Sequence, residues 1–284
     1  MDNRSYEWVL ADGSRMFACE WRPGERASVR GVVAIVHGMG EHIGRYAHVA
    51  ETLTEAGFAV FGFDQRGHGR TAGRRGHTPS YEALFEGVDR MLDDARRSCP
   101  GVPLFLYGHS MGGNVTLNYV LRRKPAIAGA IVTSPWLTLS FSPPPLQVVV
   151  GRMLERIRPT FSNNRPMIPE RLSSDPDMIR RLKEDPLGHG LISAAFFFGV
   201  QRAGLWALQH AGDLSVPLLL MHGDDDKVTS FVSSARFANA AGPLCSFREW
   251  PGFKHELHNE TGRERVFAAI RDWLDERMGA ERLS

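Results

Sequence analysis

The chain has 284 residues, 43% of them hydrophobic, and a formal net charge of +2 at pH 7. Its length exceeds the general guide of about 100–200 residues for one domain, but α/β folds often reach such a length as a single unit. The apolar content suffices for a sizeable core. A charge balance this close to neutrality gives no electrostatic case for a nucleic-acid partner, which excludes that class of function.

The cysteines and the N-terminal segment indicate the cellular compartment in which we expect the protein. Cys19, Cys99 and Cys245 are odd in number, far apart and without the spacing of a metal site, so we expect reduced thiols and no metal. The first residues hold no long apolar core of a signal peptide, and no run approaches about 18 uncharged apolar residues. We therefore expect a cytoplasmic protein.

The predicted elements begin with a hairpin and continue as alternating strands and helices. Tyr6–Leu10 and Arg15–Trp21 alternate around Ala11-Asp12-Gly13, which is a turn signal. Six further segments are predicted as strands: Val32–Val36, Phe58–Phe63, Leu104–Tyr107, Ile127–Val132, Val216–Met221 and Cys245–Trp250. Helical patterns follow at Tyr46–Ala56, at Tyr81–Ser98, from Ser110 to Pro125, after Met221, and at the end of the chain, with Val266, Ile270 and Leu274 on one face. The alternation predicts an α/β fold with a mostly parallel sheet and helices on both faces.

Between residues 137 and 211 the alternation stops. This segment begins with Pro143-Pro144-Pro145 and continues with an apolar helical pattern over Leu146–Ile157. An insertion before the next strand lies above the carboxyl ends of the strands, so we expect a helical cap at 137–211 over a core of 1–136 and 212–284. A pocket for an acyl chain needs apolar walls. We predict that the walls comprise Leu146, Val149, Phe196, Phe197 and Phe198; the alternative is that these residues pack the cap onto the core.

A nucleophile elbow joins the strand ending at Tyr107 to the next helix. Gly108-His109-Ser110-Met111-Gly112 has the G-x-S-x-G pattern, in which small residues at both ends let the backbone turn sharply and expose the serine hydroxyl. A serine hydroxyl is a weak nucleophile and needs a base that a third group orients. Ser110 is thus the candidate nucleophile.

The later strands offer that base and that acid in the expected chain order of serine, acid and histidine. The strand at Val216–Met221 leads into His222-Gly223-Asp224-Asp225-Asp226, and the strand at Cys245–Trp250 leads into a loop ending at His255. The residues alone leave Asp224, Asp225 and Asp226 open as the acid. His258, one turn beyond His255, is the alternative base.

Five motifs together resemble one family, the monoglyceride lipase and lysophospholipase branch of the α/β-hydrolases, which is also described as serine aminopeptidase-like. They are HGMGEHIGRY at 37–46, FDQRGHG at 63–69, GHSMGG at 108–113, HGDDDKVT at 222–229 and PGFKHELHNE at 251–260. The resemblance implies the α/β-hydrolase fold, with an eight-stranded sheet and a cap after the sixth strand. It also implies Asp226 as the acid, His255 as the base, and the backbone N–H groups of Met39 and Met111 as the oxyanion hole.

Other polar residues of these motifs are expected to support the site rather than to react. We interpret His37, His109 and His222 as structural, and Asp64 as part of a turn that packs the floor of the site. Glu41, His42 and Arg45 belong to the first motif. We expect them to form an ion-paired network that holds the oxyanion loop.

The predicted function is hydrolysis of a carboxylic ester with an apolar acyl group, and the resemblance suggests monoacylglycerol or lysophospholipid. No organic cofactor or metal is expected, because acyl transfer through a serine requires neither, and no glycine pattern for nucleotide binding is present. The partner is the lipid or ester substrate, with transient contact of the cap with a membrane surface. Alternatives are a carboxylesterase or thioesterase, a non-catalytic binding protein, and a prolyl-type aminopeptidase. The last needs acidic cap residues, whereas residues 137–190 hold eight Lys and Arg against six Asp and Glu.

Overall fold

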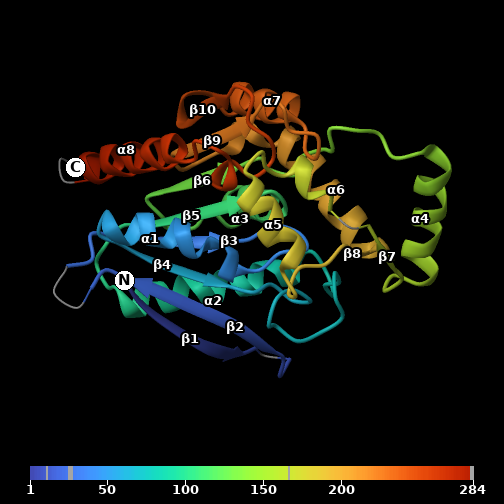
Figure 1. Cartoon of the computed structure of the whole chain (residues 1–284), viewed down its shortest axis with the longest axis horizontal. Helices are drawn as coiled ribbons and strands as arrows, with labels where there is room; N and C mark the ends of the chain where they lie inside the picture. Colours follow the sequence, from blue (N-terminus) through green and yellow to red (C-terminus); the bar gives the residue numbers. More distant parts are fainter. Residues whose placement is uncertain (11, 25–27, 166, 282–284) are drawn as a thin grey trace.

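The computed structural model describes residues 1–10, 12–24, 28–165 and 167–281. Within these ranges eight strands form one sheet in the order β1-β2-β4-β3-β5-β6-β9-β10 (Figure 1). Their bounds are β1 Asp2–Val9, β2 Arg15–Arg22, β3 Gly31–Val36, β4 Phe58–Phe63, β5 Leu104–His109, β6 Gly129–Thr133, β9 Leu218–Gly223 and β10 Cys245–Trp250. β2 runs antiparallel to β1 and β4, and every other neighbouring pair is parallel. The predicted mostly parallel sheet is confirmed.

The N-terminal hairpin forms as predicted. β1 and β2 pair from Asp2 opposite Arg22 to Val9 opposite Arg15. Of the predicted turn, Asp12 and Gly13 are described, whereas Ala11 lies outside the described residues. Gly13 has φ +79°, a conformation that glycine adopts without steric cost.

Helices cover both faces of the sheet, because side chains of a strand alternate between the two faces. On β3, Val33 and Ile35 pack with helices α1 and α8, whereas Val32 and Ala34 pack with α2 and α3. A third apolar cluster joins α3 and α7 to β6 and β9. The helices are α1 Ala47–Glu55, α2 Glu82–Ser98, α3 Met111–Arg123, α7 Phe231–Ala241 and α8 Glu264–Glu281, with short 3-10 turns η1 Ile43–Tyr46, η3 Ala211–Asp213, η4 Gly242–Leu244 and η5 Leu257–Asn259.

The predicted insertion lies after the sixth strand, between β6 and β9. It contains α4 Pro145–Ile157, β7 Ser162–Asn164, the 3-10 turn η2 Pro169–Arg171, α5 Pro176–Glu184, β8 Leu191–Ser193 and α6 Ala194–Gln209. Its two ends differ. α4 stands at the outer edge of the molecule (Figure 1) with no buried residue, whereas α6 contributes Val200 and Ala207 to the apolar clusters of the core. The domain boundaries at 137 and 211 therefore stay a prediction.

None of the described helices is both long enough and apolar enough to cross a lipid bilayer.

Candidate active site

The elbow at Ser110 is built by close backbone packing. Ser110 has φ 55° and ψ −116°, an unfavourable conformation for a residue with a side chain, and its N–H donates to the carbonyl of Thr133 on β6 at 3.0 Å. A Cβ on Gly108 would overlap the carbonyl of Gly112, and one on Gly112 would overlap the carbonyl of Val36. Both glycines are thus required where the sequence pattern places them.

Ser110, His255 and Asp226 lie in one hydrogen-bonded row. The Ser110 hydroxyl donates to His255 Nε2 at 2.9 Å, and His255 Nδ1 donates to Asp226 Oδ2 at 2.7 Å. All three residues are buried. They come from the ends of three different strands, β5, β10 and β9, which meet at the carboxyl edge of the parallel sheet. This arrangement can pass a proton from the serine to the histidine.

The Asp226 carboxylate is held in its ionised form. Burial alone would raise its pKa, but His255 beside it and the hydrogen bond from His222 Nε2 at 2.9 Å outweigh burial and keep the pKa well below its usual range. The other oxygen, Oδ1, accepts from the N–H groups of Val228 at 2.7 Å and Thr229 at 3.0 Å. His222 therefore supports the acid, as the sequence interpretation expected of it.

The electrostatics of His255 favour its protonated form. Burial lowers the pKa of the imidazole, but the Asp226 carboxylate outweighs burial and raises the pKa above its ordinary value, with smaller contributions from Glu256 and Glu41. A base whose protonated form is stabilised by a fixed carboxylate can accept the serine proton at modest cost.

The alternative acids, Asp224 and Asp225, and the alternative base, His258, are not part of the row formed by Ser110, His255 and Asp226. Asp224 accepts from the N–H of Gly252 at 2.6 Å, and Asp225 forms an ion pair with Lys227 at 2.7 Å. His258 stacks on Tyr46, with ring centroids 4.9 Å apart, and burial keeps its pKa well below the ordinary value. Among the described residues, neither nitrogen of His258 has a hydrogen-bond partner.

His37 and Asp64 join loops beneath the site. His37 Nδ1 donates to the carbonyl of Gly38 at 2.8 Å, and its Nε2 accepts from the N–H of Gln65 at 2.9 Å. The Asp64 carboxylate accepts from the N–H groups of Ile43 and Arg70, each at 2.7 Å. Neither residue is hydrogen-bonded to Ser110 or His255. A third buried side chain, His109, contacts the Thr133 hydroxyl at 3.0 Å.

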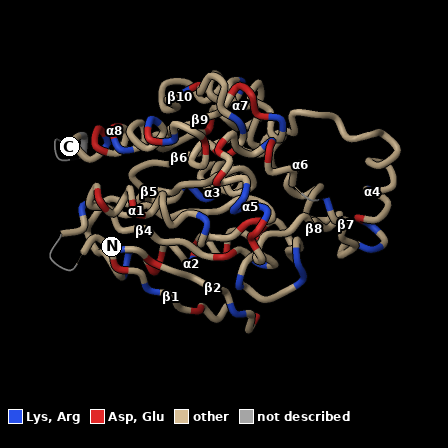
Figure 2. Tube along the Cα trace, viewed as in Figure 1, with Lys and Arg blue, Asp and Glu red and all other residues tan. Residues whose placement is uncertain are grey.

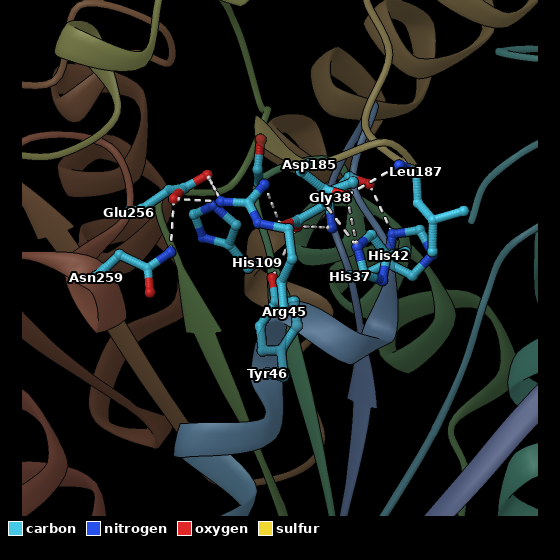
Figure 3. Close-up of polar contacts among 12 residues, drawn as sticks. His37, Gly38, His42, Arg45, Tyr46, His109, Asp185, Leu187, Glu256 and Asn259 are labelled. Carbon is cyan, nitrogen blue, oxygen red and sulfur yellow. Dashed lines mark hydrogen bonds and ion pairs between the residues drawn. The ribbon is translucent and has the colours of Figure 1, made fainter. Parts of the chain in front are cut away.

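A buried ion-pair network joins two loops (Figure 3). One is the predicted oxyanion loop, which carries Met39, and the other carries His255. Arg45 contacts Glu41 at 3.2 Å and donates to both oxygens of Glu256 at 2.7 and 2.8 Å. Glu41 also accepts from the N–H of Gly38 and from the Tyr46 hydroxyl, the latter at 2.8 Å. The oxyanion loop and the His255 loop are thus fixed to one guanidinium.

Sequence reasoning missed Glu256 and Asp185. Glu256 follows His255 directly in PGFKHELHNE, which is the signal that could have identified it. Asp185 had no such signal. It lies in the cap and contacts His42 Nε2 at 3.1 Å, so His42 binds the cap rather than the network of Arg45 (Figure 3).

Two backbone N–H groups are candidates for the oxyanion hole, because Met111 follows Ser110 in the chain and Met39 lines the same cavity as Ser110. Met111 is the first residue of α3, where an N–H has no partner within the helix. Met39 follows Gly38, whose own N–H is held by Glu41. In the part of the chain that the structure describes, the N–H groups of Met39 and Met111 donate no hydrogen bond. They can therefore donate to an oxyanion.

A cavity of about 720 Å³ opens at Ser110 and extends beneath α4. Leu146, Phe197 and Phe198 line it, as the sequence predicts, together with residues the sequence analysis did not name, such as Val150 and Leu154. Its walls are predominantly apolar, which suits a hydrocarbon chain.

Two predicted lining residues are not in the wall. Phe196 is buried in the core cluster of α2 and α3 and packs its ring on His68, because successive helical residues point about 100° apart and Phe196 falls on the core side of α6. Val149 is 66% exposed and lies on the outer side of α4, away from the cavity. The structure therefore contradicts the predicted lining role of both residues.

Comparisons with known proteins identify the family of the chain. Residues 27–262 match the family described as serine aminopeptidase, S33. The chain is 30% identical over 264 residues to a monoacylglycerol lipase of Mycolicibacterium smegmatis, covering 92% of this chain and 93% of that protein. It is 33% identical over 273 residues to an uncharacterized abhydrolase domain-containing protein of Dictyostelium discoideum, covering 95% of this chain but only 29% of that longer protein.

Among solved structures, the crystal structure of a monoacylglycerol lipase from Paleococcus ferrophilus superposes with a TM-score of 0.84 and 33% identity, covering 92% of this chain and 99% of that chain. The resemblance carried by the five motifs is confirmed. The chain belongs to the serine aminopeptidase S33 family and is an ester hydrolase built on the α/β-hydrolase fold.

Proposed function

We propose that the protein hydrolyses lipid esters with one apolar acyl chain, monoacylglycerol or lysophospholipid, through Ser110, His255 and Asp226. One observation carries the proposal: the Ser110 hydroxyl, 2.9 Å from His255 Nε2, opens into the apolar cavity of about 720 Å³. A nucleophile at the end of such a cavity meets the ester carbonyl when the chain fills the cavity.

In the proposed mechanism, Ser110 Oγ attacks the ester carbonyl while His255 Nε2 takes its proton. Asp226 holds the imidazole and stabilises the imidazolium, and the N–H groups of Met39 and Met111 bind the oxyanion. His255 then returns the proton to the departing alcohol, which leaves the acyl group on Ser110. Water attacks this acyl-enzyme with His255 again as the base, and the fatty acid and the free serine are released.

The lining disfavours one alternative. A prolyl-type aminopeptidase must bind the amine of its substrate, which calls for a carboxylate near the reacting end. No Asp or Glu is among the described residues that line the cavity. A short-chain carboxylesterase or a thioesterase would use the same three side chains, so acyl-chain preference separates these activities from a lipid hydrolase.

The experiment measures kcat/KM for p-nitrophenyl esters of two to sixteen carbons and for the matching monoacylglycerols. Each methylene that enters the cavity adds up to about 0.8 kcal/mol, close to fourfold in efficiency. Val150 lines the cavity and Val149, beside it, does not. We expect Val150→Asp to lower the efficiency for long esters about tenfold or more and to spare acetate, whereas the matched Val149→Asp leaves both unchanged.

A flat wild-type profile, or one that falls steadily from acetate, would reject the lipid proposal and favour a small-ester hydrolase. Labelling of Ser110 with a fluorophosphonate requires an activated serine. It therefore separates the serine hydrolase candidates from a non-catalytic binding protein.

We also propose that the cap touches membrane surfaces through α4. Leu146 and Ile157 are 75% and 74% exposed on this helix, and exposed apolar side chains of this size favour an interface with lipid. Sedimentation with phosphatidylcholine vesicles tests this. The double variant Leu146→Ser, Ile157→Ser should bind vesicles several-fold more weakly than wild type, and equal binding would reject the contact.

A further inference from the structure

The charged residues that line the cavity are all of one sign. They are Arg165, Arg171 and Lys227, and none of the described lining residues is acidic. Basic residues also gather around β7 and the end of α4 at the outer edge of the molecule (Figure 2). An ester hydrolase for neutral lipids does not require an excess of basic lining residues. A glycerol hydroxyl both donates and accepts hydrogen bonds, so carboxylates, amides and carbonyls can also bind it.

Arg171 lines the cavity on a turn that is hydrogen-bonded to the loop that carries His255. It ends η2, and the carbonyl of the next residue, Leu172, accepts from the N–H of Glu256 at 2.8 Å. On the other side of Arg171, the carbonyl of Glu170 accepts from Lys254 Nζ at 2.7 Å. The turn that carries Arg171 is thus hydrogen-bonded to both neighbours of His255.

Arg165 also lines the cavity, and its backbone is linked to the loop that carries Met39. Its N–H donates to the carbonyl of Gly190 at 2.8 Å, and the preceding residue, His189, donates its N–H to the carbonyl of Gly40 in the oxyanion loop at 2.9 Å. The Arg165 guanidinium donates to Gln147 Oε1 at 2.5 Å. This neutral partner on α4 also lines the cavity, which places the guanidinium at the cavity wall.

Arg165 and Arg171 are both exposed, so they are accessible to an anion from solution. Lys227 is paired with Asp225 at 2.7 Å, but neither Arg165 nor Arg171 forms an ion pair within the described residues. The apolar part of the lining, which includes Phe141, Leu154 and Phe161, surrounds the rest of the cavity. Two planar donors without an anion, beside an apolar chamber, match an amphiphile with a phosphate near its ester.

We propose that Arg165 and Arg171 bind the phosphate of an anionic monoacyl glycerophospholipid, so that this lipid, rather than neutral monoacylglycerol, is the preferred substrate. The inference rests on the proposed lipid hydrolysis and selects one substrate class within it. The ester carbonyl lies at Ser110, the acyl chain lies under α4, and the phosphate lies between η2 and the segment after β7.

The test compares two substrates that differ only in the phosphate, 1-octanoylglycerol and 1-octanoylglycerol 3-phosphate, each below its critical micelle concentration. The short chain keeps both monomeric, so contact of the cap with an interface plays no part. We expect kcat/KM of the wild type to be at least tenfold higher for the phosphate ester. Arg165→Gln and Arg171→Gln should each lower the phosphate-to-neutral ratio about tenfold, because a charge-assisted hydrogen bond is lost.

Arg156→Gln is the matched control, because Arg156 is an exposed arginine of α4 that is not part of the cavity lining; it should leave the ratio unchanged. Arg165→Lys, which keeps a charge, should restore part of the ratio. Added salt should lower the ratio in the wild type and not in the double Gln variant.

Two results would overturn the inference: a wild-type ratio near one, or a ratio that neither variant changes, including the case in which a variant loses activity equally on both substrates. Hydrolysis of the neutral ester in these cases leaves the proposed lipid hydrolysis intact. Failure to hydrolyse either ester, with folding intact by circular dichroism, would instead reject the proposed function and this inference with it.

Discussion

Helices α3 and α4 are each 13 residues long, yet they stand at opposite extremes of burial. Every residue of α3 from Met111 to Leu121 is buried, whereas α4 has no buried residue. Even the polar residues of α3 are used: Asn114 and Asn118 donate to carbonyls of Val200 and Ala203 on α6, each at 3.1 Å. Helix α3, which begins directly after Ser110, is enclosed by its surroundings, whereas α4, which covers the cavity, has no buried residue.

This contrast separates the chemistry of the site from the selection of substrate. The reacting groups sit where packing and hydrogen bonds leave one arrangement. The apolar wall of the cavity includes residues of α4, a helix with no buried residue, so we expect these residues to change with little cost to folding. Variants at the buried end should therefore have larger effects than variants on α4.

The largest expected effect is that of Ser110→Ala. Removal of the nucleophilic oxygen should lower kcat by about 10⁶-fold, since a serine hydrolase without its serine retains only the help of the oxyanion hole and of binding. The change deletes one atom, so the melting temperature should stay within a few degrees of wild type. Ester hydrolysis by the purified variant is the measurement, and activity within tenfold of wild type would remove Ser110 from the mechanism.

The second prediction ranks neighbours of the same type. Asp226→Asn should lower kcat about 10⁴-fold, because the amide cannot stabilise the imidazolium and favours the wrong tautomer. Asp224→Asn and Asp225→Asn should cost less than about tenfold, since within the described residues these side chains bond to Gly252 and Lys227 and not to His255.

His255 and His258 offer the same kind of comparison for the base. His255→Ala should cost several orders of magnitude in kcat and His258→Ala far less. The opposite order at either pair, measured at saturating ester, would place the acid or the base elsewhere.

Much of this site could be predicted because its signals are local. Ser110 stands in a pattern that only a sharp strand-to-helix turn satisfies, and Asp226 and His255 follow apolar runs that end at the same edge of the sheet. Parallel strands bring such ends together whatever their separation in sequence. Strands β3, β4, β5 and β9 were predictable for a similar reason, since each is a fully buried run of six residues that stands out from its flanks.

Other features depended on packing that no local pattern encodes. Phe196 and Phe197 are adjacent and chemically identical, but the rotation of α6 sends one into the core and the other to the cavity. The contact between Arg45 and Glu256 joins residues 211 positions apart. Its existence depends on how two loops meet, which the sequence predicts only through the fold.

The third prediction tests the burial contrast directly through stability. Leu117 on α3 is 1% exposed within the cluster of α7 and β9, and Met153 on α4 is 53% exposed. Leu117→Ala should lower the free energy of unfolding by about 2–5 kcal/mol because it leaves a cavity. Met153→Ala should change it by less than about 0.5 kcal/mol. Urea unfolding monitors both, and a comparable loss for Met153→Ala would mean that α4 is packed in solution.

The smallest expected effect concerns the pH profile and tests the network of Arg45. His255 accepts the serine proton only when neutral, so kcat/KM rises as the pH increases through the pKa of His255 in the free enzyme. Glu256 raises that pKa through its negative charge. Glu256→Gln removes the charge and leaves Arg45 less compensated, and both changes lower the pKa. The acidic limb of the profile should therefore move to lower pH.

Glu256→Asp is the control that distinguishes charge from structure. It keeps the carboxylate and loses part of the contact with Arg45, so it can lower activity but should leave the acidic limb near its wild-type position. If Glu256 only fixes the geometry of the loops, both variants lower kcat and neither moves the limb. A limb that moves in Glu256→Gln alone means that this carboxylate, and not only Asp226, sets the pH at which His255 can act as a base.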